Sequence, residues 1–287
     1  MTTQIKGTST ITSRVEIRSA ADVQVDALRV AMNQSFSDYA LPINLTAEAF
    51  DVMMRQRGLD RTASRVAIID GEMAAIWLVS VRGAAAYLIS SGTRPAYRRR
   101  GLSRALAVDC LAALKGNGAT SFQTEVLIDN KQAHNLYLSL GMTTARVLDC
   151  YSLSVPKSAV RRYEVSEVSW PSVAQTAPSL QDFPPSWQND AASLNAIADD
   201  VQCHAVFDDA GAAGYAAVIS TTGTLAQIAV RQDRRRMGIA GALLSSYQDL
   251  QSLRVINADN ASGTFRAFMT SFGAEPTLGQ YELKMSL

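Results

Sequence analysis

The chain has 287 residues, of which 47% are hydrophobic and 18% charged, and its formal net charge is +1. This length suits two domains of about 140 residues better than one, and the near-zero charge gives no electrostatic reason to expect a nucleic-acid partner. The three cysteines are too widely spaced for a disulfide framework or a metal site, and no apolar run approaches transmembrane length. Because residues 1–13 also lack the apolar core of a signal peptide, we expect a cytoplasmic protein with no metal and no membrane partner.

The first half of the chain alternates between strand and helix patterns. In chain order we predict a strand at 15–18, helices at 23–36 and from Thr46, strands at 64–69, 73–81 and 84–93, and a helix at 102–116. Asp70-Gly71 separates two of these strands and is a dipeptide typical of a tight hairpin turn. The element order is therefore strand, two helices, three strands, helix.

The turn between the strand at 84–93 and the next helix is basic and reads Arg98-x-x-Gly101-x-Ser103. A helix N-terminus carries unpaired N–H groups and a positive dipole end, so it can hold a phosphate group. Glycine at 101 and a small residue at 103 let a bulky anion approach the backbone. The backbone N–H groups from Arg99 to Arg104 are thus candidate ligands of a pyrophosphate. The alternative is an ordinary turn with a solvated basic cluster.

This stretch resembles motif A of the GNAT superfamily of N-acetyltransferases, which reads approximately Val-x-Pro-x-x-Arg-x-x-Gly-x-Gly/Ala. The residues at the motif positions are Thr93, Pro95, Arg98, Gly101 and Ser103. Threonine in place of valine is a mild change, whereas Ser103 departs from the usual glycine or alanine.

A second stretch, after a predicted strand at 121–128, resembles GNAT motif B. It reads Asn130-x-x-Ala133-x-x-x-Tyr137-x-x-x-Gly141. Asn130 either bonds the pantetheine arm of CoA or caps the helix that follows, and it can do both. The resemblance implies acetyl-CoA as cosubstrate, bound by Thr93, Arg98, Arg99, Arg100, Gly101, Leu102, Ser103, Arg104, Asn130 and Ala133.

The phosphate turn occurs twice. The stretch 230–240 repeats it, with Val230 matching Thr93, Gly238 matching Gly101 and Ala240 matching Ser103. We therefore expect an α/β (α+β) fold of two tandem GNAT-like domains, at 14–155 and 160–287, each a mixed, mostly antiparallel twisted sheet flanked by helices.

The resemblance also implies catalytic residues in the first domain. Tyr137 stands where the family's catalytic tyrosine stands and is the candidate acid for the leaving thiolate. Glu125 lies five residues before Asn130, at the spacing of the base in some GNAT N-terminal acetyltransferases, and is the candidate base. The alternatives are a hydrogen-bonded core tyrosine and a solvated or salt-bridged strand glutamate.

In the GNAT pattern the first two helices and their connection wall the acceptor site. Phe36 and Tyr39 are therefore candidate substrate contacts, with Phe50 as a further aromatic of the same helices. Phe36 and Phe50 are equally well explained as core residues of a helical pair. Tyr39 lies in a loop and is therefore the stronger candidate for a substrate contact.

The second copy lacks both catalytic candidates. Counting back from Gly273, Met269 takes the place of Tyr137, and Asn257 takes that of Glu125, or Val255 if a two-residue insertion is allowed. We thus expect an acetyl-CoA-dependent N-acetyltransferase that acts on a primary amine in the first domain, with a degenerate, structural second domain. The acceptor is a small-molecule amine or a peptide N-terminus, and the chain is a monomer or weak dimer because its two domains can pair. The alternative is a catalytically inactive CoA-binding or scaffold protein.

Overall fold

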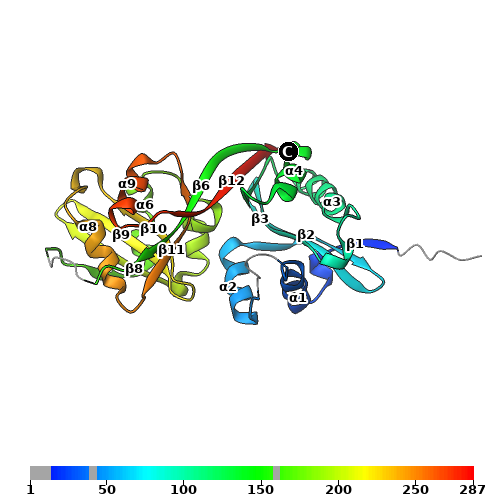
Figure 1. Cartoon of the computed structure of the whole chain (residues 1–287), viewed down its shortest axis with the longest axis horizontal. Helices are drawn as coiled ribbons and strands as arrows, with labels where there is room; N and C mark the ends of the chain where they lie inside the picture. The colour runs from blue at the N-terminus through cyan, green and yellow to red at the C-terminus, as the bar shows by residue number, and fades with distance from the viewer. Residues whose placement is uncertain (1–13, 39–43, 158–161) are drawn as a thin grey trace, which may run out of the picture.

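The structure, a computed structural model, describes residues 14–38, 44–157 and 162–287 and has two lobes joined by long strands (Figure 1). The elements of the first half are β1 (Val15–Ser19), α1 (Val25–Ser35), α2 (Ala47–Arg57), β2 (Leu59–Ile69), β3 (Glu72–Arg82), β4 (Ala85–Thr93), α3 (Leu102–Gly116), β5 (Ser121–Leu127), α4 (Lys131–Ser139) and β6 (Thr143–Ser154). Those of the second half are β7 (Ser166–Val168), α5 (Trp170–Ala174), α6 (Ala177–Leu180), α7 (Ala191–Asn195), β8 (Val201–Asp208), β9 (Gly211–Ile219), β10 (Thr224–Val230), α8 (Ile239–Leu244), β11 (Ser252–Asp259), α9 (Gly263–Ser271) and β12 (Pro276–Ser286).

Local signals set the ends of several elements. The Thr46 hydroxyl accepts a hydrogen bond from the Ala49 N–H at 3.2 Å and so caps α2. Asp70 and Gly71 have φ of 52° and 84°, as a type I′ hairpin turn between β2 and β3 requires. β2 begins at Leu59, earlier than predicted, because its first residues pair with β3 across an irregularity in the register.

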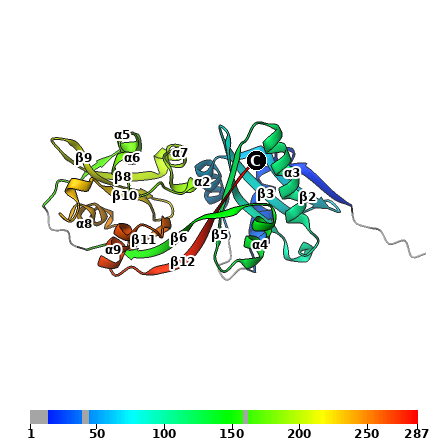
Figure 2. The same ribbon diagram turned by 90° about the horizontal axis from the view of Figure 1, so that it is seen from above.

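One sheet runs through both halves of the described chain, in the strand order β1-β2-β3-β4-β5-β12-β6-β11-β10-β9-β8-β7. The C-terminal strand β12 lies between β5 and β6 and pairs antiparallel with both. β6 in turn continues into the second lobe and pairs with β11. Figure 2 shows β6 and β12 passing together between the lobes. The two halves thus exchange strands.

This exchange bears on the predicted domains. The division into 14–155 and 160–287 follows the chain, but the sheet crosses it, because β12 completes the sheet of the first lobe. The boundaries themselves stay a prediction. The mixed α/β architecture, with helices flanking a largely antiparallel sheet, confirms the predicted fold class.

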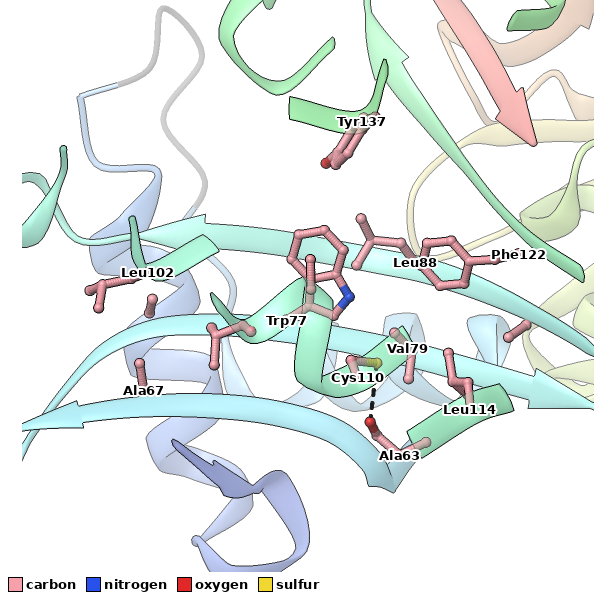
Figure 3. Packing of buried hydrophobic residues seen from close by; sticks show 14 of the residues in the cluster. Ala63, Ala67, Trp77, Val79, Leu88, Leu102, Cys110, Leu114, Phe122 and Tyr137 are labelled. Carbon is pink, nitrogen blue, oxygen red and sulfur yellow. Dashed lines mark hydrogen bonds between the residues drawn. The ribbon is translucent and has the colours of Figure 1, made fainter. Parts of the chain in front are cut away.

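Helices cover both faces of the first lobe's sheet. On one face α3 and α4 pack over a core that includes Trp77, Leu88 and Phe122 (Figure 3). On the other face α1 and α2 pack over a core that includes Tyr87 and Ile89. Four of the five residues that α3 buries recur every four positions: Leu102, Leu106, Cys110 and Leu114.

The helices before the hairpin differ between the halves. In the first half α1 and α2 have 11 residues each. In the second half α5, α6 and α7 have five, four and five residues. The second lobe therefore has much less helix with which to wall a pocket.

Candidate active site

The predicted phosphate turn adopts the conformation that its glycine allows. Arg99 and Gly101 have φ of 63° and 76°, in the left-handed region, and α3 begins directly after them. The first backbone hydrogen bond of α3 runs from the Ala105 N–H to the Gly101 carbonyl at 3.0 Å, so the N–H groups of residues 102–104 have no partner within the helix. Beyond its chain neighbours, no described atom lies within 4 Å of the point where a Cβ on Gly101 would stand. The turn therefore combines N–H groups that lack a partner within the helix with open space at Gly101, as an anion site requires.

Arg98, by contrast, binds other parts of the protein. Its Nε donates to the Thr93 carbonyl at 3.1 Å, and its guanidinium donates to the Ser35 carbonyl at 3.0 Å and to both carboxylate oxygens of Asp38 at 2.6 and 2.7 Å. The hydrogen bond from Arg98 holds the pKa of the Asp38 carboxyl below its usual range. These contacts join the end of α1 to the end of β4. The cofactor role of Arg98 stays a prediction beside this structural one.

Three other predicted cofactor residues link elements around the turn. The hydroxyls of Thr93 and Ser103 lie 3.0 Å apart and connect β4 to the first turn of α3. Arg104 donates to the Ser139 hydroxyl at 2.5 Å and so joins α3 to α4.

The remaining cofactor candidates divide into exposed and buried residues. The Arg99 and Arg100 side chains are exposed at the turn, whereas Leu102 is 4% exposed and packs into the core. The Asn130 side chain accepts from the Ala133 N–H at 3.1 Å and caps α4. Capping, one of the two roles open to Asn130, is therefore observed.

β4 and β5 separate near the predicted site. They pair in parallel only as far as Tyr87 and Gln123, and within the described residues no ladder joins the rest of these two strands. The pairing of β4 with β3 also skips Ile89, a β-bulge that shifts the alternation of side chains by one residue. As a result Tyr87 packs in the core beneath α1 and α2, whereas Ser91 contacts α4 on the opposite face.

Tyr137 projects from α4 toward the open end of β4. Its ring lies edge-on to Trp77, with the centroids 6.1 Å apart (Figure 3), and it is 4% exposed. Its hydroxyl lies 3.0 Å from the Ser91 hydroxyl. The phenol is therefore held both by packing and by a hydrogen bond, at the place where the two strands separate.

Glu125 lies on β5 and faces the α1 and α2 side of the sheet. Its Oε2 accepts a short hydrogen bond from the Tyr87 hydroxyl, and its Oε1 is buried with no hydrogen-bond partner in the described chain. Burial raises the pKa of Glu125 to about 7, against the lowering effect of the Tyr87 hydrogen bond. Burial likewise raises the pKa of Tyr87, next to the Glu125 charge. Glu125 can therefore exchange a proton near neutral pH.

Charged residues of three other elements surround this carboxyl. Glu282 of β12 is directly opposite Glu125 in the sheet and further raises its pKa, while Arg57 and Arg146 lower it. Glu282 is 1% exposed and accepts from two nitrogens of Arg146 at 3.0 and 2.9 Å. Lys284 adds a third cationic contact to Glu282 at 3.1 Å. The strand donated by the second half thus supplies a carboxyl that acts on the pKa of Glu125.

The predicted acceptor contacts have different outcomes. Phe36 follows α1 and packs against the core beneath α1 and α2, and a Cβ on Gly92 would come within 3.2 Å of its ring. It therefore lies beside the end of β4, and its substrate role stays a prediction. Tyr39 lies outside the described residues.

Tyr87, Ser91 and Glu282 are not among the site residues that the sequence predicts. Ser91 lies two residues before Thr93 on the predicted strand 84–93, so the sequence places it on that strand. The sequence does not predict which side of the sheet Ser91 faces, because strict alternation would place Tyr87 and Ser91 on the same side. Glu282 could not be found, because its place beside Glu125 depends on the strand exchange.

The corresponding cleft of the second half is filled by its own chain. The Asn189 side chain donates to the Ile256 carbonyl at 2.7 Å, and Gln227 donates to the Asn189 carbonyl at 2.5 Å, so residue 189 bridges β10 and β11. The Phe183 ring packs edge-on against Phe265 with the centroids 5.4 Å apart. The cavity left between these elements is about 40 Å³.

No group of three or more His, Cys, Asp or Glu residues in the described part of the chain is arranged to hold a metal ion. In the same part, no helix combines the length and apolar character needed to cross a membrane.

The comparisons with known proteins agree with this geometry. Residues 30–142 match the model of the acetyltransferase (GNAT) family. A tandem GNAT protein from the clavulanic acid biosynthesis pathway is similar in fold, with a TM-score of 0.69 at 14% identity over 95% of this chain and 98% of the other. A GCN5-related N-acetyltransferase from Sphaerobacter thermophilus gives a TM-score of 0.68 at 18% identity, over 95% of both chains. One from Anabaena variabilis gives 0.61 at 11% identity, over 94% of this chain and 72% of the other.

The search of curated proteins finds no match. The structural likenesses cover both lobes, whereas the family match lies within the first half. Residues 30–142 of this chain are therefore similar to the acetyltransferase (GNAT) family, and the fold of the described chain is similar to that of tandem GNAT proteins.

Proposed function

We propose that the protein is an acetyl-CoA-dependent N-acetyltransferase that moves an acetyl group to a primary amine by direct attack, in the cleft between β4 and β5 of the first half. The observation that carries this proposal is the placement of two proton-exchanging groups on opposite faces of that cleft. Tyr137 contacts β4 at Ser91 on the α4 side, and Glu125 contacts it at Tyr87 on the α2 side. The bulge at Ile89 between those two contacts creates this arrangement.

The cofactor side of the cleft suits acetyl-CoA. The N–H groups of residues 102–104, together with the dipole of the 15-residue helix α3, can hold the pyrophosphate. Tyr137 lies on the same side of the sheet as α3, where the thioester would follow the open edge of β4. Its hydroxyl can give a proton to the thiolate of CoA as the carbon–sulfur bond breaks.

The acceptor side suits an amine that must lose a proton. A lysine-type amine, with a pKa of about 10.4, costs roughly 4–5 kcal/mol to deprotonate at pH 7, and an α-amine near 8 costs about 1 kcal/mol. As the nitrogen attacks the acetyl carbon, its proton passes to Glu125. A carboxylate whose pKa is about 7 is suited to this task at neutral pH.

A thiol-release assay tests the proposal. The full chain is incubated with acetyl-CoA and a panel of small amines, amino acids, amino sugars and short peptides, and each acetylated product is checked by mass spectrometry. We expect CoA release that depends on the amine and is lost in both Glu125→Gln and Tyr137→Phe. A wild-type chain that binds acetyl-CoA but never exceeds the hydrolysis background would instead support the non-catalytic CoA-binding alternative.

A further inference from the structure

A short segment of the second half lies directly on the Tyr87–Glu125 pair. Trp187 belongs to the turn that precedes α7, and it is 7% exposed. Its ring stacks on the Tyr87 ring, with the centroids 5.1 Å apart and the planes 8° from parallel. Its Nε1 donates to the Arg57 carbonyl at the end of α2, at 3.1 Å. One side chain of the second half thus contacts both β4 and α2 of the first.

The neighbours of Trp187 hold it in this position. Arg82 lies over the Trp187 ring, with its Cζ 4.3 Å from the centroid. The same guanidinium donates to both carboxylate oxygens of Asp190 at 2.9 Å and to the Ser193 hydroxyl at 2.8 Å. The Ser193 hydroxyl donates in turn to the Trp187 carbonyl at 2.6 Å. The indole is therefore fixed from both lobes, and α7 and α2 lie next to each other in Figure 2.

Gln188 extends the contact toward the bulge of β4. Its side-chain carbonyl accepts from Arg57 at 2.7 Å, and its backbone carbonyl accepts from Gln56 at 2.7 Å. Arg57 also donates to the carbonyl of Ile89, the bulged residue, at 3.4 Å. The second half therefore braces the irregular part of β4 that lies between Tyr87 and Ser91.

We propose that Trp187 is a positioning residue for the active site of the first half: it holds the Tyr87 ring so that the hydroxyl points at Glu125, and it keeps water away from that pair. The inference rests on the proposed role of Glu125 as the base. It gives the second half a part in catalysis beyond covering apolar surface.

The surroundings of Trp187 show where water would enter. Trp187 lines a cavity of about 430 Å³ between the lobes, together with Arg146, Glu282 and other residues of the strand junction. Its ring therefore borders this space while it stacks on Tyr87. We expect a smaller side chain at 187 to let water from the cavity reach the Tyr87–Glu125 pair.

The surroundings of Glu125 determine whether its pKa should rise or fall in each variant. The groups that face it are Tyr87 of β4, Glu282 of β12, Arg57 at the end of α2 and Arg146 of β6. Burial is the largest influence and raises the pKa of Glu125. Water that enters would solvate the carboxylate and replace the donor lost if Tyr87 turns away, so the pKa of Glu125 should fall. Removing the hydroxyl alone, in Tyr87→Phe, keeps the site dry and should raise it.

The experiment is a titration of the full chain with ¹³C-labelled glutamate side chains, followed by NMR, with the Glu125 signal assigned from Glu125→Gln. We expect Trp187→Leu to lower the pKa of Glu125 by about one unit and Tyr87→Phe to raise it by a similar amount. Trp187→Phe keeps a stacking ring and should stay close to the wild type. Trp187→Met, which has no ring but more apolar volume, gives the same test if the leucine variant does not fold.

The matched control is Asp200→Asn. It removes the charge from the ion pair between the halves, in which Arg55 lies 3.3 Å from the Asp200 carboxylate. Neither Tyr87 nor Glu125 takes part in this ion pair. Its titration should match the wild type. If folded Trp187→Leu or Trp187→Met also leaves the Glu125 titration unchanged, the positioning role is overturned.

Activity separates this inference from the proposed function. In an active enzyme, the acid limb of the pH profile of kcat/KM should move to lower pH in Trp187→Leu, with the KM for acetyl-CoA unchanged. If the Glu125 signal moves as expected but no amine is acetylated by the wild type, Trp187 does position the pair and the proposed function is wrong.

Discussion

The two phosphate turns of this chain have the same backbone conformation but very different surroundings. Arg99 and Arg236 have φ of 63° and 61°, and Gly101 and Gly238 have φ of 76° and 92°. Even the arginine that leads each turn makes the same contacts. Arg98 and Arg235 each donate to the carbonyl at the end of the preceding strand at 3.1 Å, and each pairs with an aspartate. The motif is therefore built twice to the same geometry.

The difference lies in what surrounds each turn. α3 has 15 residues, whereas α8 has six, so fewer aligned peptide dipoles stand behind the second turn. At the positions of Tyr137 and Glu125 the second half has Met269 and Asn257. The Asn257 side chain is already taken by Gln280, which donates to it at 2.5 Å. The turn geometry that the two halves share thus reflects how this fold joins a strand to a helix. A reaction on a bound ligand also needs the residues of the neighbouring strands.

Glu125→Gln should give the largest effect. Glutamine keeps the shape and removes the proton acceptor, so kcat/KM should fall by about 10²- to 10⁴-fold. The wild-type rate should rise with pH through about 7 as Glu125 ionises, and this limb should disappear in the variant. Steady-state rates from pH 5 to 9 measure both effects, with Asn257→Asp as the matched change in the second half. A gain or loss in that control of more than about twofold would contradict the division of labour between the clefts.

Tyr137→Phe should give the next largest effect. The ring keeps its packing on Trp77 and loses only the hydroxyl near Ser91. Turnover should fall by about 10- to 1,000-fold, with little change in acetyl-CoA affinity by calorimetry. Tyr247→Phe is the control, since it removes a buried hydroxyl that donates to the Ala216 carbonyl at 2.7 Å in the second half. Turnover in Tyr137→Phe within a factor of two of the wild type would return Tyr137 to a purely structural role.

Much of this site could be predicted from the sequence because its signals are local. The turn glycine, the cap at Thr46 and the hairpin at Asp70-Gly71 depend on neighbouring residues, and each adopts the expected conformation. The loss of an acid and a base in the second copy is likewise visible from spacing alone, at Met269 and Asn257.

What the sequence did not reveal depends on residues far apart in the chain. The contact between Arg98 and Asp38 joins residues that are 60 positions apart. The bulge at Ile89 interrupts the alternation of side chains from which the faces of a strand are predicted. Tyr87 and Ser91 therefore face opposite sides of the sheet. The strand exchange that brings Glu282 beside Glu125 is a pairing across most of the chain length, and no periodicity encodes it.

Valine at the two turn glycines compares the clefts directly. Both positions have positive φ and open space around them, so each variant should lose a similar free energy of unfolding, about 1–3 kcal/mol, from backbone strain. Only Gly101→Val should also weaken acetyl-CoA binding, by about tenfold or more, because its side chain enters the space before the N–H groups. Urea unfolding gives the first quantity and calorimetry the second. If Gly238→Val abolishes turnover while Gly101→Val leaves it, the active site belongs in the second half.

The smallest effects should come from Arg98→Ala and Arg235→Ala, which test whether the leading arginine serves the fold or the cofactor. Each guanidinium joins the end of a strand to an aspartate of an earlier segment, Asp38 in one half and Asp182 in the other. Because both pairs are partly exposed, each variant should lose only about 1 kcal/mol of unfolding free energy. Acetyl-CoA affinity should change by less than about threefold in both, since the N–H groups of residues 102–104 remain. A loss of about tenfold or more confined to Arg98→Ala would show that this guanidinium turns to the phosphate when acetyl-CoA binds, and that the contact with Asp38 is given up in the working enzyme.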